Sequence, residues 1–417
     1  MGAYPKKFRA ATVLTAIMLT GSALGIVGTA QAAKHKAPQP PIKIGEIVPI
    51  NTATGTQVQP YTGVKAAVRG INAAGGVDHR KLQLVFCNEG GDPNAATACA
   101  NLMVADKVVA TVYDSSTTAG LQVSQILKAA RIPEIYPNVE FSGQYSLPNV
   151  FPLDGGHPFA FGGMIQLAHS LYNVKSLDIV RLNVPAVALY STVIENAAKN
   201  VGVKVVNTIN IPVSVTDYSS YAQQIAQDKP DAVITVIIES QCTPLIEAIA
   251  QAGDTNIRYL SDPATCGAPE LAQLGPLANG MMAVSTLPPI ADTALPGIRL
   301  FLKDMQREAN SGDTNAATSQ IGQNTLIGWM AVQGFAKAAA SVKGSLTSLS
   351  LLTYLHKAKN LNVQGLATWS PGAIGPLQGY RSVTNFGLWP QVVQNGKYTT
   401  VGSKPISTLQ AMMGLAP

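Results

Sequence analysis

The densest run of side chains that could bind a small molecule is Tyr113-Asp114-Ser115-Ser116-Thr117-Thr118. It stands between an apolar run of strand length and a run with helical period. Free backbone N–H groups at the start of such a helix, together with the neighbouring hydroxyls, suit a carboxylate or another acceptor. The plainer alternative is that one hydroxyl only caps the helix. We expect Asp114 to point away from the acceptor, because its own charge would repel an anion.

A second polar run, Glu239-Ser240-Gln241-Cys242, directly follows the apolar run Asp231–Ile238. Ligands of open parallel sheets bind beyond the carboxyl ends of the strands, where the next helices start. At least one of these polar side chains should therefore face a binding cleft, and Glu239 is the candidate for contacting a donor group.

Strand-like and helix-like runs alternate along most of the chain, and these elements would position the polar runs. The predicted strands are Ile42–Ile50, Leu82–Cys87, Val108–Tyr113, Ile132–Tyr136, Ser176–Leu182, Val203–Ile209, Asp231–Ile238 and Ile257–Leu260. The predicted helices are Val64–Ala73, Pro93–Val104, Ala119–Ala130, Phe159–Leu171, Ala186–Asn200, Tyr218–Gln227 and Leu245–Ala252. Repeated strand–helix units predict an α/β fold with parallel sheets covered by helices on both faces.

The alternation falls into two series that are separated near Pro152–His157, which predicts two α/β lobes. The later part of the chain does not start a third series. Its predicted elements are the helices Gly297–Glu308, Asn324–Val342 and Thr347–Ala358, and short strands within Pro376–Lys397. We expect these pieces to complete the two lobes, so that the chain crosses between them more than once.

The start of the chain has the pattern of an export signal. Lys6, Lys7 and Arg9 precede the uncharged run Ala10–Val27, and Ala30-Gln31-Ala32 has the small-x-small form that signal peptidases accept. We predict a signal peptide over residues 1–33 and a flexible leader over residues 34–41. No later run has the length and hydropathy of a membrane span. We therefore expect an exported chain without stable membrane insertion, in the periplasm, the cell envelope or the extracellular space.

The charge of the mature chain is close to balanced. Removing Lys6, Lys7 and Arg9 from the 29 Lys and Arg leaves 26 against 23 Asp and Glu, a net charge of +3. The remaining cations are scattered and are not interleaved with aromatic residues, so nucleic acid is not an expected partner. With 47% hydrophobic residues in 417, the chain can bury a large core.

The four cysteines are Cys87, Cys99, Cys242 and Cys266, and an even number in an exported chain favours disulfides. Three pairings are possible. Cys87 ends a predicted strand and Cys99 lies early in the next predicted helix, which makes them natural partners. That leaves Cys242 with Cys266, each just past a strand-like run.

Several short motifs follow one another in a set order along the mature chain. They are Ile42–Ile50, Gly63 with its helix, Ile71-Asn72-Ala73-Ala74-Gly75-Gly76-Val77, Asp92-Pro93, Ile132-Pro133 with Tyr136-Pro137, and Asp217-Tyr218 before Pro230-Asp231-Ala232-Val233. In this order they resemble the type I periplasmic solute-binding proteins of the branched-chain amino acid (Leu/Ile/Val) transport class. The resemblance covers about Ile42 to Lys397.

The resemblance implies two Rossmann-like lobes joined by three crossovers, near Pro152–Gly155, Ala283–Leu287 and Gly375–Tyr380. Lobe 1 would comprise residues 42–153 and 286–375, and lobe 2 residues 154–285 and 376–410. Family members bind a small molecule in the cleft and close over it by a hinge movement. They hand it to a membrane permease with a cytoplasmic ATPase. We expect the same of this chain, acting as a monomer.

The resemblance also indicates which loops bind the ligand. The family holds the ligand carboxylate with hydroxyls at the position of Thr117, so the loop with Ser115, Ser116, Thr117 and Thr118 is the expected acceptor site. The family also contacts its ligand through the loop that contains Asn138, and Glu140 replaces a family hydroxyl there. That departure speaks against a simple aliphatic amino acid and favours a cationic or amide group.

Three further positions follow from the resemblance. Asp262 falls where the family holds the ligand ammonium, and Gln57 lies where the family often has an aromatic residue. Tyrosines that line the cleft in the family are missing near Val184–Ala186, and Tyr190 is not an evident substitute. The alternatives are a solvated loop position for Glu140 and a turn-forming role before proline for Asp262. His157, close to a crossover, could line the cleft or be structural.

We therefore predict a solute-binding receptor that captures a small polar or zwitterionic molecule, such as an amino acid or an amide, for an ABC importer. The motifs H-E-x-x-H, G-x-S-x-G and the P-loop are absent. We expect no catalytic residue, no cofactor and no metal. The alternative is a sensing receptor for amides or amino acids that works with a separate signalling partner.

Overall fold

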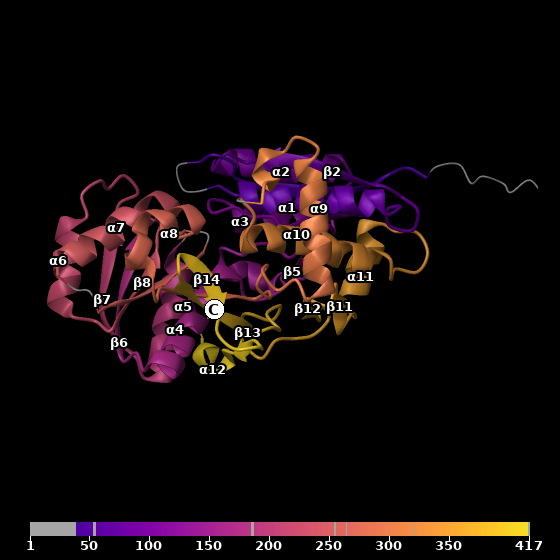
Figure 1. The fold of residues 1–417 in the computed structure, drawn as a ribbon. Coiled ribbons are helices and arrows are strands. Elements are labelled where there is room, and N and C mark those ends of the chain that lie inside the picture. The colour runs from indigo at the N-terminus through magenta and orange to yellow at the C-terminus, as the bar shows by residue number, and fades with distance from the viewer. Residues whose placement is uncertain are drawn as a thin grey trace, which may run out of the picture. The chain divides into compact units, whose positions relative to one another are not determined.

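The structure is a computed structural model that describes residues 39–52, 56–184, 187–253, 256–263, 265–318 and 320–415. The predicted signal peptide and most of the predicted leader lie outside these residues. Strands and helices alternate over most of the described chain (Figure 1). The fold is α/β, as predicted, with the strands in two main sheets.

The first main sheet is parallel throughout and has the order β2-β1-β3-β4-β5. Its strands are β1 (Ile42–Val48), β2 (Leu82–Asn88), β3 (Ala110–Val112), β4 (Glu134–Ile135) and β5 (Val150–Phe151). The order reverses between β1 and β3. In open parallel sheets, this reversal is where the loops at the carboxyl ends of the strands leave room for a ligand.

The second main sheet is mixed, with the order β14-β13-β10-β9-β8-β6-β7 and β15 beside β13. Its strands are β6 (Ser176–Leu182), β7 (Lys204–Ile211), β8 (Ala232–Val236), β9 (Arg258–Ser261), β10 (Met282–Ser285), β13 (Gly387–Gln394), β14 (Lys397–Thr400) and β15 (Ile406–Ser407). The pairs from β7 to β10 are parallel. In contrast with the predicted parallel sheet, β13 is antiparallel to both β10 and β14, because a tight turn at Asn395 and Gly396 joins β13 to β14 as a hairpin.

Helices cover the sheets. In the first half of the chain they are α1 (Val58–Ala73), α2 (Pro93–Ala105), α3 (Gly120–Ala129), α4 (Gly156–Tyr172), α5 (Ala188–Val201), α6 (Ser219–Asp228) and α7 (Glu239–Gln251). Later come α8 (Ala268–Leu274), α9 (Pro296–Ala309), α10 (Gln323–Ala339), α11 (Ser348–Leu355) and α12 (Leu409–Met412). Short 3-10 turns add η1 (Ser142–Ser146), η3 (Gly275–Ala278) and η4 (Thr314–Ala316), and β11 (Leu361–Val363) pairs with β12 (Ala367–Trp369).

Two helices begin one and a half turns before their predicted starts. α1 begins at Val58 and not at Val64, and α7 begins at Glu239 and not at Leu245. Pro60 and Pro244 stand in these added segments. Pro60 stands in the first turn of α1, where an N–H has no helical partner to lose, whereas Pro244 stands inside α7 and removes one hydrogen bond of that helix. For α6, Asp217 accepts a hydrogen bond from the N–H of Ser219, at 2.9 Å, one residue ahead of the observed N-cap Tyr218.

The second half of the chain returns to the first sheet. One hydrophobic core contains buried residues of β1, β3, β4 and α1 together with residues of α9, α10 and α11. Figure 1 shows α9 and α10, in orange, beside α1 and β2, in indigo, although these segments are far apart in the sequence. A separate core joins α4, α5 and the second sheet with residues 377–415.

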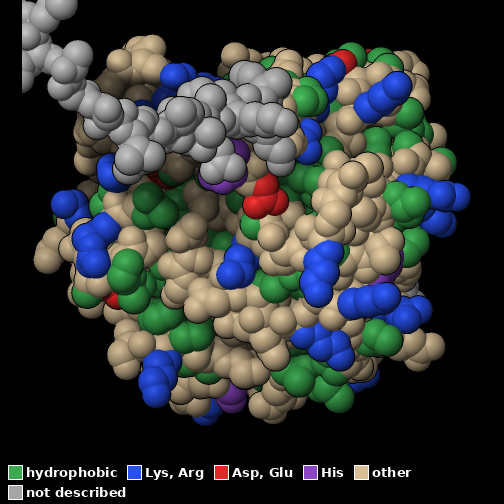
Figure 2. Space-filling model, turned by 90° about the vertical axis from the view of Figure 1, so that its right-hand side faces the viewer, with side chains coloured by type: hydrophobic (Ala, Val, Ile, Leu, Met, Phe, Trp, Pro, Cys, Tyr) green, Lys and Arg blue, Asp and Glu red, His purple; other side chains and the backbone are tan. Residues whose placement is uncertain are grey.

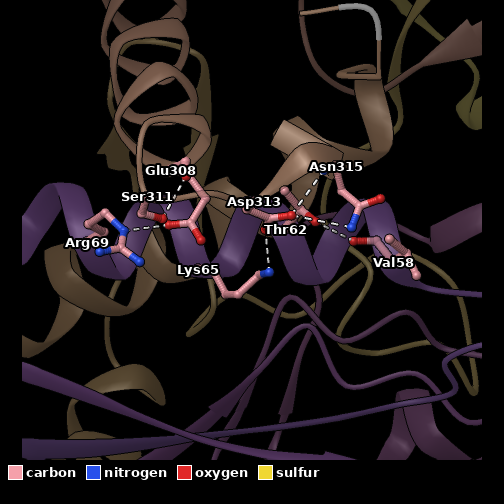
Figure 3. A network of polar contacts seen from close by, with 8 residues as sticks. All are labelled: Val58, Thr62, Lys65, Arg69, Glu308, Ser311, Asp313 and Asn315. Atoms are coloured by element: carbon pink, nitrogen blue, oxygen red, sulfur yellow. Dashed lines mark hydrogen bonds and ion pairs between the residues drawn. The ribbon is translucent and has the colours of Figure 1, made fainter. Parts of the chain in front are cut away.

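A polar network reinforces the contact of α1 with the last turn of α9 and the segment after it (Figure 3). Lys65 of α1 forms an ion pair with Asp313, and Arg69 forms one with Glu308 at 2.7 Å. The hydroxyl of Ser311 donates to the carbonyl of Glu308. Because Glu308 is buried, its pairing with Arg69 offsets part of the cost of removing a charge from water.

The two disulfides predicted from the order of the elements are both present, Cys87–Cys99 and Cys242–Cys266. The first joins the end of β2 to α2. The second joins the first turn of α7 to the loop after β9. No helix in the described part of the chain is long and apolar enough to cross a membrane.

Candidate functional site

Two tyrosines mark the carboxyl ends of adjacent strands in the first sheet. Tyr113 directly follows β3 and Tyr136 directly follows β4, with φ values of 51° and 53°. Non-glycine residues in the left-handed region carry strain of roughly 1–3 kcal/mol each and concentrate at functional sites. Both side chains are buried. The loops that leave this edge of the sheet are therefore held in a costly but fixed conformation.

The loop after β3 turns its carboxylate and its serine hydroxyls inward and leaves its two threonines at the surface. Asp114 accepts a hydrogen bond from the backbone N–H of Ile47 in β1, at 2.9 Å, so it points away from the loop surface as expected. Thr117 is partly exposed and Thr118 is exposed. The hydroxyl of Thr117 has no hydrogen-bond partner among the described residues.

Ser116 is already engaged by the protein. Its hydroxyl donates to the carboxylate of Glu89, from the loop after β2, and accepts a hydrogen bond from the N–H of Ala119 at 3.1 Å. Ala119 is the N-cap of α3, and no side chain caps this helix, so the plainer alternative of a capping hydroxyl is wrong for Ser116.

A chain of hydrogen bonds links the loops after β3 and β4 to α5. The amide of Asn138 donates to the hydroxyl of Ser115 at 3.3 Å and to the carboxylate of Glu140 at 2.8 Å. The hydroxyl of Tyr190, in α5, donates to the same carboxylate at 3.1 Å. Glu140 is only 4% exposed. The alternative of a solvated loop glutamate is therefore wrong.

His157 and Asp262 add a second pair to this region. Nδ1 of His157, at the start of α4, lies 3.4 Å from a carboxylate oxygen of Asp262, after β9. Asp262 also forms the backbone turn expected before proline, since its carbonyl accepts from the N–H groups of Thr265 and Cys266. The turn-forming role predicted for Asp262 is therefore observed, and its role in holding a ligand ammonium stays a prediction.

These groups share one electrostatic environment. Burial raises the pKa of Glu140, while the charge of His157 and the hydrogen bonds from Tyr190 and Asn138 oppose the rise. Burial also raises the pKa of Tyr113 and of Tyr190, and the charges of Glu140 and Asp262 add to both shifts. We call the group the polar cluster; its members are Glu89, Tyr113, Ser115, Ser116, Asn138, Glu140, His157, Tyr190 and Asp262.

The residues predicted for the site are partly brought together. Ser115, Ser116, Asn138, Glu140 and Asp262 belong to the polar cluster. Gln57 lies at its margin, where its amide oxygen is 3.4 Å from the hydroxyl of Tyr113.

Glu239 is an exposed first residue of α7, and no described contact joins it to the cluster. Its pKa is raised by burial of part of the side chain and by Glu270.

Four cluster members were not predicted as ligand-binding residues, although one of them, Tyr113, belongs to the polar run singled out in the sequence. Glu89 could have been found from its place after β2, beyond the carboxyl end of a strand. Tyr190 and His157 reach the cluster from helices, and helical position alone does not indicate which way a side chain points. Among the described residues, no three or more His, Cys, Asp or Glu are grouped so that they could hold a metal ion.

Known proteins share this fold. A crystal structure of a branched chain amino acid ABC transporter from Thermus thermophilus, with bound valine, has a TM-score of 0.72 at 15% identity and covers 90% of this chain and 98% of its own. A fatty acid ABC transporter substrate-binding protein from Thermomonospora curvata also has a TM-score of 0.72 at 15% identity, covering 91% of this chain and 95% of its own. At such identities the likeness concerns the fold.

Sequence comparison points the same way. The Leu/Ile/Val-binding protein homolog 3 of Brucella melitensis is 32% identical over 99 residues, which span 23% of this chain and 26% of that protein. The family described as Periplasmic binding protein matches residues 41–377, most of the chain. The chain therefore belongs to the periplasmic binding protein family.

Proposed function

We propose that this chain is an extracytoplasmic solute-binding receptor. It captures a small polar or zwitterionic molecule, such as an amino acid or an amide, by hinge closure and delivers it to the permease and ATPase of an ABC importer. It acts as an exported monomer and needs no cofactor. Family membership and the export pattern of the first residues support this role.

The observation that carries the proposal is the hydrogen bond between Glu140 and Tyr190. Glu140 lies on a loop at the carboxyl edge of the first sheet, and Tyr190 lies in α5, whose core belongs with the second sheet. The loop packs on the same core through Val139 and Tyr145. A buried polar contact between a loop of the first sheet and a helix of the second is what a receptor that closes over a polar solute requires, because buried polar groups need partners in the closed state.

A hinge is consistent with the contacts at the crossover near Pro152. The indole N–H of Trp369 donates to the carbonyl of Pro152 at 3.1 Å, and its ring packs edge-on against Tyr136, with ring centroids 4.8 Å apart. These contacts tie the crossover to the strained end of β4. Binding at that edge could therefore be coupled to movement of the crossover.

A thermal-shift screen of the mature chain tests the receptor function. The chain is unfolded, washed free of carried-over solute, refolded, and screened against amino acids, amides, urea, polyamines and small aromatic acids. A solute that binds only the folded state must raise the melting temperature. We expect a saturable rise with at least one solute and a decrease of the radius of gyration on binding. A refolded chain that responds to none of these solutes would contradict the proposal.

A further inference from the structure

The hydrogen-bond donors of the polar cluster are largely taken by its own carboxylates. Ser116 donates to Glu89, and Asn138 and Tyr190 both donate to Glu140. A ligand carboxylate that used these donors would have to displace a buried glutamate from them. The cluster is therefore poorly suited to an anion at its centre.

The charges around the cluster lead to the same conclusion. Glu89, Glu140 and Asp262 are its acidic members, and His157 is its one member that can carry a positive charge. Among the described residues, the charges of Glu140 and Asp92 act on Glu89, and the charge of His157 acts on Glu140. Buried carboxylates of this kind are costly unless a cation or several N–H donors reach them.

One oxygen of the cluster still lacks a donor. Oε1 of Glu89 is buried and has no hydrogen-bond partner among the described residues. The other oxygen of the same carboxylate is held by Ser116, which fixes the group inside the cluster and beside Glu140. Unlike the unpartnered carboxylates inside the sheets, this one lies just beyond the carboxyl end of β2, where a donor on a bound solute can reach it.

We propose that the bound solute is an organic cation without a carboxylate, such as an amine, an amidine or an amino-acid amide. Its N–H groups contact Glu89, Glu140 and Asp262, and a neutral acceptor, such as an amide carbonyl, contacts the hydroxyl of Thr117. The proposal rests on the receptor function and narrows its ligand. An α-amino acid would place its carboxylate next to its ammonium, and so against Glu89 or Glu140.

Two matched pairs of small molecules test this ligand class. L-Arginine is compared with agmatine, which lacks only the carboxylate, and L-leucine with L-leucinamide, in which an amide replaces it. Dissociation constants are measured by titration calorimetry on the refolded mature chain at pH 7.5. We expect at least one carboxylate-free member to bind at least about tenfold more tightly than its partner.

Two outcomes would contradict the proposed ligand class and leave the proposed receptor function unaffected. One is that neither carboxylate-free compound binds more tightly than its carboxylate partner, although members of the pairs bind. The other is no binding by any of the four compounds while the wider solute screen gives a clear response elsewhere. If the chain binds no compound in the titrations and none in the thermal-shift screen, both proposals are contradicted.

The variant Glu89→Gln assigns the effect to this carboxylate. It keeps the shape of the side chain and an oxygen that can accept from Ser116, and it removes the charge. We expect it to weaken binding of the preferred cation at least about tenfold. We also expect a smaller ratio between the dissociation constants of the matched carboxylate compound and of the cation. Glu195→Gln, at an exposed position of α5, is the control and should change neither value. If a folded Glu89→Gln chain shows the same ratio of dissociation constants as the wild type, the role of Glu89 is contradicted. If this variant does not fold, the two matched pairs measured on the wild-type chain still decide the ligand class.

Discussion

Buried carboxylates are the most unusual feature of this chain at the scale of single residues. Glu46 in β1, Asp178 in β6 and Glu134 in β4 all lie inside the sheets, and burial raises the pKa of each. Ionised carboxylates prefer water, so such groups either find donors or stay protonated. Glu134 has donors in Ser124 and Asn149. The oxygens of Glu46 have no hydrogen-bond partner among the described residues.

Asp178 should make the stability of the protein depend on pH. Burial, together with the charge of Asp228, raises its pKa from 3.8 to about 7 in the folded chain. The folded state therefore keeps a proton that the unfolded state has lost. The free energy of unfolding should fall as the pH rises from about 4 to about 7, and then level off.

Asp178→Asn should reduce this slope. We expect the variant to match the wild type near pH 4 and to be more stable by about 1–3 kcal/mol at pH 8, because an amide carries no charge to bury. Urea unfolding at several pH values measures the effect, with the exposed Glu195→Gln as control. Equal slopes in the variant and the wild type would show that Asp178 is ionised in the folded chain.

At the scale of elements, α1 and α10 cross at two glycines. A Cβ atom on Gly63 would lie 2.0 Å from the carbonyl oxygen of Thr325, and one on Gly328 would lie 2.1 Å from the carbonyl oxygen of Pro60. Both obstacles are backbone atoms, which cannot move aside by changing a rotamer. The two helices can therefore approach this closely only with glycine at both positions.

Gly63→Ala should force α1 and α10 apart. We expect a loss of roughly 2–4 kcal/mol in the free energy of unfolding, even though alanine favours a helix over glycine by about 1 kcal/mol. Chemical denaturation measures it. Gly387→Ala is the control, since its Cβ would meet no atom closer than 3.4 Å. A neutral Gly63→Ala variant would contradict the close crossing of the two helices.

The disulfides also act at this scale, by closing loops. Cys87–Cys99 spans 12 residues of sequence and Cys242–Cys266 spans 24. Replacing both cysteines of a pair by alanine should cost roughly 3 kcal/mol for the first pair and slightly more for the second, because the longer loop gains more freedom in the unfolded chain. Guanidinium unfolding of the two paired variants tests this order. Stability equal to that of the wild type in either variant would contradict it.

The elements were largely predictable from the sequence because each strand and helix has its own local period. The strand Ser176–Leu182 was predicted with its observed bounds. The two-residue strand β5 was not predicted, because two residues carry no period. The antiparallel position of β13 was not predicted either, since it depends on pairing with β10, which is distant in the sequence. The order of the strands was enough to predict which loops belong to the site. The presence of Tyr190 and His157 in the site depends on how whole helices pack, which the sequence pattern does not indicate.

At the scale of the whole molecule, burial of acidic side chains changes the character of the surface. Glu46, Glu89, Asp114 and Glu134 are buried, as are four other acidic residues, and no Lys or Arg is buried in the described part of the chain. Figure 2 accordingly shows a face where Lys and Arg side chains gather with few Asp or Glu among them. The surface is thus more basic than the balanced composition of the mature chain indicates.

The hydrogen bond from Tyr190 to Glu140 should favour the closed arrangement of the two lobes. It is buried, and its acceptor is a carboxylate, so its loss should cost about 1.5–3 kcal/mol in the closed state. The open state has water to replace this bond and should lose little. Tyr190→Phe should therefore shift the chain towards the open state, with a larger radius of gyration by X-ray scattering.

The same variant should bind solute more weakly by roughly 10- to 150-fold, because a smaller fraction of the chain is in the closed, binding state. Tyr172→Phe is a suitable control. The guanidinium of Arg258, in β9, lies over its ring in α4, so loss of the hydroxyl leaves that contact in place. If Tyr190→Phe binds solute like the wild type and scatters with the same radius, then the Glu140–Tyr190 bond is present in both states. Closure would then have to draw its free energy from contacts with the solute itself, made chiefly by Glu89 and Asp262.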